Sequence, residues 1–77
     1  MDVFEEVKKI IVSELNCKPE QVTLDVNLKD DLGADSIDAV QIVMDIEDTF
    51  GIIVDEDNAQ SMLTVKNIVE YIEANTK

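Results

Sequence analysis

The sequence contains no histidine, arginine or tryptophan, and it has only two glycines, one proline and one cysteine. Without histidine, the chain can form neither a Ser-His-Asp triad nor a Cys-His pair, and it lacks the usual general base and zinc ligand. Gly33 and Gly51 lie too far apart to form a phosphate-binding loop of the Walker or dinucleotide type. Most hydrolytic mechanisms and nucleotide binding are therefore excluded, and we expect the chain not to be an enzyme.

Cys17 is the only cysteine, so no disulfide can form within the chain. No histidine is available to activate its thiol. We therefore expect Cys17 to be a small, half-buried apolar residue without chemistry of its own.

Basic residues are also scarce, because six lysines oppose 18 acidic residues and leave a net charge of -12. The resulting field repels nucleic-acid phosphates and anionic lipid head groups, and it attracts basic patches on other proteins. No apolar run approaches the roughly 18 consecutive residues of a membrane-spanning helix, and the N-terminus is acidic where a signal peptide is basic. We expect a monomeric cytoplasmic protein that binds basic proteins, and neither nucleic acid nor membrane.

Apolar residues make up 45% of the 77 residues and recur at helical spacing, which indicates a packed fold despite the high charge. A chain of this length has room for one hydrophobic core. We expect residues 1–77 to form a single all-α domain, a small helical bundle of three main helices and one short helix. A long ordered loop over residues 17–35 is expected to join the first two helices. Five apolar residues are predicted to hold this loop on the core: Val22, Leu24, Val26, Leu28 and Leu32.

Local sequence signals predict where the first helix stops and where the last two helices start. The first helix is expected to end near Asn16, just before the proline that interrupts the chain. The acidic residues 55–57 predict the start of a short helix that reaches about Met62, because negative charge is favourable at a helix N-terminus. Thr64 predicts the cap of the last helix, with fraying over residues 75–77.

The second helix is expected to begin with Asp35 or Ser36 as its cap and to run to Phe50, with Gly51 as the stop. Projected at about 100° per residue, its apolar residues fall on two opposite sides. One stripe is expected to face the core: Ala39, Ile42, Val43, Ile46 and Phe50. The other stripe consists of Ile37, Val40 and Met44. Because a small domain can bury only one of them, we predict that the second stripe is an exposed docking strip in an acidic frame.

Ser36 lies in the most acidic part of the chain, since the 36 residues from Asp30 to Val65 contain ten acids and no base. A serine before a helix most often serves only as the cap, but Asp35 can provide the cap here. The Ser36 hydroxyl is then free to face solvent at the positive end of the helix, where backbone N–H groups can bind phosphate. These residues predict an attachment point for a phosphate-linked group.

A dedicated metal site is not predicted, although carboxylates are plentiful. Counted from Asp25, the EF-hand pattern fails, with Lys29 at the fifth place and Asp30 where the turn glycine belongs. Ser36 also occupies the place of the closing glutamate. Weak, diffuse binding of divalent cations stays open for two groups of acids: Asp30, Asp31, Asp35 and Asp38, or Glu47, Asp48 and Asp55.

Three segments of the sequence resemble the acyl carrier proteins, and the resemblance extends over essentially the whole chain. The segments are the attachment run Gly33-Ala34-Asp35-Ser36-Ile37, the acidic helix end Glu47-Asp48-Thr49-Phe50-Gly51 and the third-helix entry Val54-Asp55-Glu56-Asp57-Asn58-Ala59. The resemblance implies that Ser36, beside Asp35, is esterified by 4′-phosphopantetheine, which a separate phosphopantetheinyl transferase takes from coenzyme A. It also implies that the thiol of this arm carries acyl groups as thioesters between the enzymes of fatty acid synthesis.

The same resemblance implies a docking face and an acyl pocket. Basic patches on partner enzymes are expected to contact the second helix at Ile37, Asp38, Val40, Gln41, Met44, Asp45, Glu47 and Asp48. The acyl chain is expected to lie between the helices, against Val43, Ile46, Val54, Ala59, Met62 and Ile68. Ordinary core packing would place each of these six residues inside equally well, so the pocket assignments stay open at this point.

The sequence departs from the family pattern at three places. Ile37 follows the serine where leucine is commoner, Gln41 stands where an acid is usual, and Val54 stands where proline often precedes the acidic cap. Two alternatives therefore stay open beside a carrier of fatty acid synthesis. One is a carrier of the same fold for polyketide, aminoacyl or specialised lipid synthesis, and the other is a non-carrier acidic module that binds proteins.

Overall fold

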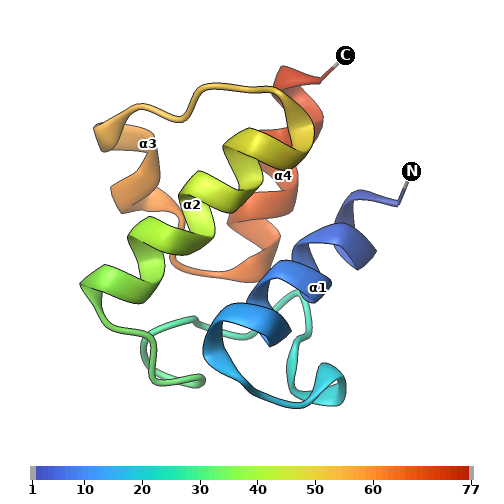
Figure 1. Ribbon diagram of the computed structural model, residues 1–77, viewed down its shortest axis with the longest axis vertical. Helices are drawn as coiled ribbons and strands as arrows, with labels where there is room; N and C mark the ends of the chain where they lie inside the picture. The colour runs from blue at the N-terminus through green and yellow to red at the C-terminus, as the bar shows by residue number, and fades with distance from the viewer. Residues whose placement is uncertain (1, 77) are drawn as a thin grey trace.

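The computed structural model describes residues 2–76, which form a bundle of helices without a β-strand. Its elements are α1 (Val3–Leu15), η1 (Pro19–Gln21), α2 (Ser36–Phe50), α3 (Glu56–Ser61) and α4 (Val65–Asn75). In Figure 1, α1 packs against both α2 and α4, and the short α3 lies at the edge of the bundle. The predicted all-α fold, with three main helices and one short helix, is confirmed. The 3₁₀ turn η1 was not expected, and Pro19 suits its first position because φ is already fixed there.

The predicted helix starts are confirmed by their capping hydrogen bonds. Asp35 caps α2 through a bond from the Asp38 N–H to Asp35 Oδ1 at 2.9 Å. Asp55 caps α3 in the same way, with the Asn58 N–H donating to Asp55 Oδ1 at 2.8 Å. Thr64 caps α4 as predicted, with its hydroxyl oxygen accepting the N–H three residues later. Each cap satisfies an N–H group that the first turn of a helix leaves without a partner.

The helix ends are set by backbone conformation and, at the C-terminus, by side chains. Asn16 after α1 and Gly51 after α2 both adopt the left-handed conformation, with φ of 57° and 66°. Both stops were predicted, and the glycine pays no steric penalty for this φ. Fraying was predicted from residue 75, but α4 extends through Asn75. The Asn75 amide donates to the Tyr71 carbonyl at 2.8 Å and the Thr76 hydroxyl to the Ile72 carbonyl at 2.9 Å, while Lys77 lies outside the described residues.

One hydrophobic cluster holds the elements together. The buried residues are Val7, Ile11, Val22, Leu28, Ala34, Ile42, Ile46, Val54, Met62, Val65, Ile68, Val69 and Ile72. Every main helix contributes to this cluster, as the amphipathic patterns predict. Cys17 is half-buried and packs against the cluster, as expected of a small apolar residue.

The loop over residues 17–35 is tied to the chain just before α4. The Leu28 N–H donates to the Leu63 carbonyl at 3.0 Å, and the Val65 N–H donates to the Val26 carbonyl at 3.2 Å. These bonds flank an isolated antiparallel bridge between Asn27 and Thr64. The loop is therefore ordered by backbone bonding to a segment more than 30 residues away, in addition to its apolar contacts.

Four of the five apolar residues predicted to hold this loop do pack on the core. Val22 and Leu28 are buried, and Val26 and Leu32 are partly buried. The prediction is wrong for Leu24, whose side chain is 45% exposed. Leu24 instead holds the loop through its carbonyl, which accepts the Lys66 N–H at 2.9 Å.

The segment between α2 and α3 is held by two side chains. Glu47 Oε2 accepts the Val54 N–H at 2.9 Å in a partly buried position, and the Tyr71 hydroxyl donates to the Ile53 carbonyl at 3.1 Å. A proline at position 54 would have no N–H for the first of these bonds. This bond can therefore form because position 54 is valine here, whereas the family often has proline at this position.

We expect Glu47→Ala to lower the free energy of unfolding by about 1–3 kcal/mol, because the partly buried Val54 N–H would lose its acceptor. Asp48→Ala is the matched control, since Asp48 is exposed and the same negative charge is removed. This control should stay within about 0.5 kcal/mol of the parent. Urea unfolding followed by circular dichroism compares the two variants, and equal stabilities would show that the Glu47 bond contributes nothing.

Candidate functional site

Ser36 is the first residue of α2, and its side chain is exposed. Asp35 is the cap of this helix, and the capping is reciprocal because the Asp35 N–H donates to Asp38 Oδ2 at 3.3 Å. Within residues 2–76, neither the Ser36 hydroxyl nor the backbone N–H groups of Ser36 and Ile37 have a hydrogen-bond partner. The cap therefore leaves the hydroxyl available for chemistry, beside N–H groups at the positive end of α2.

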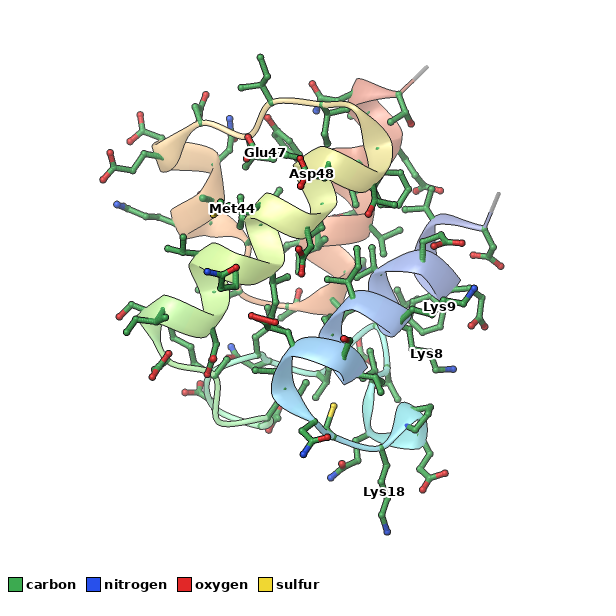
Figure 2. All side chains as sticks on the ribbon, in the orientation of Figure 1. Lys8, Lys9, Lys18, Met44, Glu47 and Asp48 are labelled. Atoms are coloured by element: carbon green, nitrogen blue, oxygen red, sulfur yellow. The ribbon has the colours of Figure 1, made fainter. Side chains whose placement is uncertain are left out.

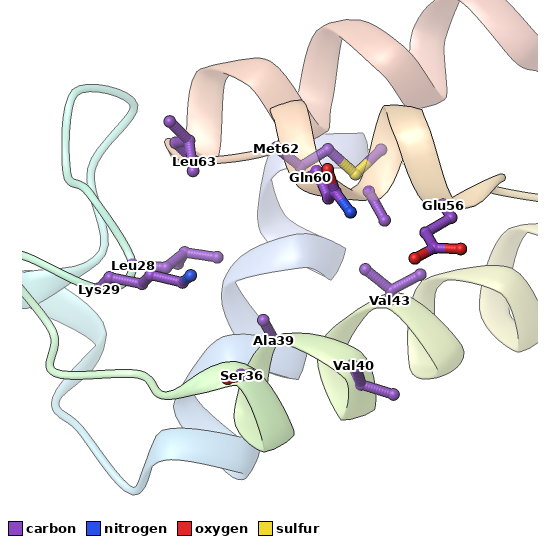
Figure 3. A pocket seen from close by; sticks show the side chains of 11 residues that line it. Leu28, Lys29, Ser36, Ala39, Val40, Val43, Glu56, Gln60, Met62 and Leu63 are labelled. Carbon is purple, nitrogen blue, oxygen red and sulfur yellow. The ribbon is translucent and has the colours of Figure 1, made fainter.

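A pocket of about 350 Å³ opens beside Ser36, between α2, α3 and the loop that precedes α2. It is lined by Leu28, Lys29, Ser36, Ala39, Val40, Val43, Glu56, Ala59, Gln60, Met62 and Leu63. Figure 3 shows Ser36 and Lys29 toward one end of this pocket and Val43 and Glu56 toward the other. The volume is at the lower end of the range of small-molecule pockets, and most of the lining residues are apolar. A group attached to Ser36 can therefore reach an apolar space directly.

Only some of the residues predicted for an acyl pocket line this space. Val43, Ala59 and Met62 do so. Ile46, Val54 and Ile68 do not line it and lie in the core cluster, where Ile46 and Ile68 are 0% and 1% exposed. These three residues are buried in the core cluster and do not line the pocket.

The family model for the phosphopantetheine attachment site matches residues 5–72. The chain is 42% identical to the acyl carrier protein of Campylobacter hominis over 73 residues, which are 95% of this chain and 92% of that protein. It is also 40% identical to the acyl carrier protein of Wolinella succinogenes, over 97% of this chain and 99% of that one. The chain belongs to the acyl carrier protein family.

The fold agrees with this assignment. A solved structure of the acyl carrier protein from Enterococcus faecalis superposes with a TM-score of 0.82 at 40% identity. The superposition covers 95% of this chain and 92% of the other. As a member of the family, the chain is an acyl carrier whose cofactor is 4′-phosphopantetheine.

The geometry around Ser36 fits this cofactor. An ester phosphate on the Ser36 hydroxyl would meet the unpaired N–H groups at the start of α2. When bound, the cofactor supplies a terminal thiol that holds acyl groups as thioesters. The chain's own contribution is to expose the hydroxyl and to offer an adjacent apolar pocket.

The second apolar stripe of α2 is exposed, as the sequence predicts. Ile37, Val40 and Met44 are 72%, 55% and 50% exposed. We call these three residues the α2 strip. Figure 2 shows Met44 with Glu47 and Asp48 along α2, whereas Lys8, Lys9 and Lys18 lie away from them on α1 and beside η1. These three lysines are thus separated from the α2 strip, whereas Lys29 lines the same pocket as Val40.

The polar residues expected beside the α2 strip are not equivalent. Gln41 and Asp48 are exposed, and Asp45 is half-buried. Asp38 and Glu47 are half-buried, and each already accepts a backbone N–H of this chain. Gln41, Asp45 and Asp48 are therefore better placed for intermolecular contacts than the two residues that already bond the backbone.

Two further observations concern the whole described chain. No group of three metal-ligating side chains that could hold an ion occurs within residues 2–76. In the same part of the chain, no helix combines the length and apolar character needed to cross a bilayer.

Proposed function

We propose that this chain is a free-standing carrier of dissociated fatty acid synthesis, with 4′-phosphopantetheine esterified to Ser36. The observation that supports Ser36 is its exposed hydroxyl at the start of α2, left free because Asp35 provides the cap. The names of the two relatives identify them as acyl carrier proteins, and the acidity of α2 suits a carrier that visits many basic partners. The carrier itself catalyses no step.

The partners of this carrier are a phosphopantetheinyl transferase and the enzymes that elongate and use the acyl chain. Their basic patches dock on the α2 strip and on the acidic side chains beside it, chiefly Asp45 and Asp48. The acyl chain is held in the pocket against Val43, Ala59 and Met62. The protein acts as a monomeric single domain in the cytoplasm.

Reconstitution with the purified enzymes of a dissociated fatty acid synthesis system tests the pathway. The phosphopantetheinylated protein is expected to accumulate acyl thioesters of increasing length, which intact-protein mass spectrometry detects. A protein that accepts the arm but is not elongated would instead be a carrier for another pathway. Gln41 and Ile37 lie on the exposed face of α2, so such a result would point to these two positions.

We expect Met44→Gln to lower kcat/KM for the transfer of phosphopantetheine to the protein by about tenfold. Met44 is a half-exposed apolar side chain at the centre of the docking face, and its contact with the transferase would be lost. The melting temperature should not change, since the side chain lies outside the core. Leu24→Gln is the matched control, because Leu24 is 45% exposed and lies outside α2, on the loop that follows η1. Equal losses in the two variants would show that Met44 has no special part in docking.

A further inference from the structure

Lys29 lines the pocket together with Ser36, and Figure 3 shows its side chain extending from the loop into the end of the pocket where Ser36 lies. Among the pocket-lining residues within the described range 2–76, it is the only basic one. Glu56, which also lines the pocket and is ionisable, lies toward the opposite end. The pocket is therefore polar at both ends, with its positive charge on the side of Ser36.

The backbone of Lys29 is held in place relative to the start of α2. Its N–H donates to Asn27 Oδ1 at 2.9 Å, and its carbonyl accepts the Gly33 N–H at 3.1 Å. The neighbouring Leu28 carbonyl accepts the Ala34 N–H at 2.8 Å. These bonds join the segment around Lys29 to the residues that immediately precede Ser36. Hydrogen bonds of the main chain therefore hold the backbone of Lys29 relative to Ser36.

Lys29 is a positively charged residue near a serine that is flanked by acidic residues. Asp35 and Asp38 flank the serine, and both carboxylates would repel an anionic group on its hydroxyl. Lys29 forms no ion pair within residues 2–76, where the salt bridges found are Lys8 with Glu5 and Lys9 with Glu6. Its ammonium group is therefore free to pair with an anion that arrives at Ser36.

We propose that Lys29 binds the phosphate of the 4′-phosphopantetheine arm and so positions the arm at the mouth of the pocket. This inference rests on the proposed attachment at Ser36. Lys29 offsets the repulsion between the phosphate and the two capping carboxylates, while the N–H groups at the start of α2 contact the remaining phosphate oxygens. The effect is modest, because Lys29 is exposed and solvent screens the pair.

Reductive methylation of the protein before and after attachment of the arm tests this role without any variant. Pairing with the phosphate should slow methylation of Lys29 by about two- to fivefold in the loaded protein, as residue-resolved mass spectrometry measures. Lys18 is the internal control, since it is exposed and does not line the pocket, and its rate should not change. High salt should remove the protection of Lys29.

Variants provide a second readout. We compare the change in melting temperature that attachment of the arm causes in each protein. This change should be about 2–5 °C lower for Lys29→Gln than for the parent. Lys29→Arg should behave as the parent because it keeps the charge, and Lys18→Gln should also behave as the parent.

Two negative results are distinguishable. If the intact mass shows the arm on the parent but Lys29 is methylated at the same rate with and without it, the role of Lys29 is overturned and the proposed function stands. If the parent accepts no arm at all, the proposed attachment fails and this inference fails with it.

Discussion

Replacing Ser36 with alanine is expected to abolish attachment of 4′-phosphopantetheine completely while leaving the helical circular dichroism signal unchanged. The loss is complete because the hydroxyl oxygen is the atom that forms the ester. The fold is preserved because Asp35, not Ser36, caps α2, and because the Ser36 side chain is exposed and makes no hydrogen bond within residues 2–76. The change in the free energy of unfolding should stay within about 0.5 kcal/mol.

Ser13→Ala is the matched control for this variant. Ser13 is an exposed serine on α1, so the substitution removes the same group from a helix without an attachment role. Intact-protein mass spectrometry after incubation with coenzyme A and a transferase should show full modification of Ser13→Ala and none of Ser36→Ala. Modification of both variants would contradict the assignment of Ser36, and unfolding of Ser36→Ala would contradict the capping role of Asp35.

Lowering the ionic strength from about 0.15 M to about 0.01 M is expected to lower the melting temperature by roughly 10 °C or more. The Debye length grows from about 8 Å to about 30 Å over this range. The molecule measures 29 × 25 × 19 Å, so at low salt each carboxylate repels acids across the whole fold. Within residues 2–76 the salt bridges found lie on α1, which leaves the acids of α2 and α3 without ion-pair partners. Repulsion acts on a domain with a total stability of only about 4–12 kcal/mol.

Calorimetry across this salt range measures the effect, and magnesium should restore stability at a lower concentration than sodium because it screens more strongly. Asp48→Asn provides the charge control, since Asp48 is exposed and its neutralisation should raise the melting temperature at low salt more than at high salt. A melting temperature that does not depend on salt would show that repulsion between the acids does not destabilise the fold.

The helices were predictable because their ends depend on local chemistry. Asp35, Asp55 and Thr64 each bond an N–H three residues away, and Gly51 stops α2 through its own backbone conformation. The two stripes of α2 were also predictable, because helical periodicity places Met44 and Ile46 on different sides. Short-range patterns of this kind do not require knowledge of the tertiary fold.

The pocket was harder to predict because it depends on contacts between distant segments. Leu28 and Leu63 are 35 positions apart, and a backbone hydrogen bond brings them together. No periodicity in either segment signals this bond, so both residues, with Lys29, were missed as pocket-lining residues. Ile46 and Ile68 were assigned to the pocket from the family resemblance, and they lie in the core cluster instead. Their apolar spacing could not prevent this assignment, since it does not distinguish a core residue from a pocket residue.

Glu47 illustrates a different limit of sequence patterns. An acid near the end of an acidic helix is expected to face solvent and partners. Its carboxylate instead accepts the Val54 N–H, seven residues later, and thereby holds the segment before α3. The sequence shows the charge at this position but not the orphan N–H that the charge satisfies.

The most direct measurement of the central claim is fragment-ion mass spectrometry of the parent protein after incubation with coenzyme A, magnesium and a promiscuous phosphopantetheinyl transferase. We expect one 4′-phosphopantetheine per chain, with every fragment that carries it containing Ser36. An adduct on Ser13 or Ser61, or a folded protein that accepts no adduct, would contradict this expectation.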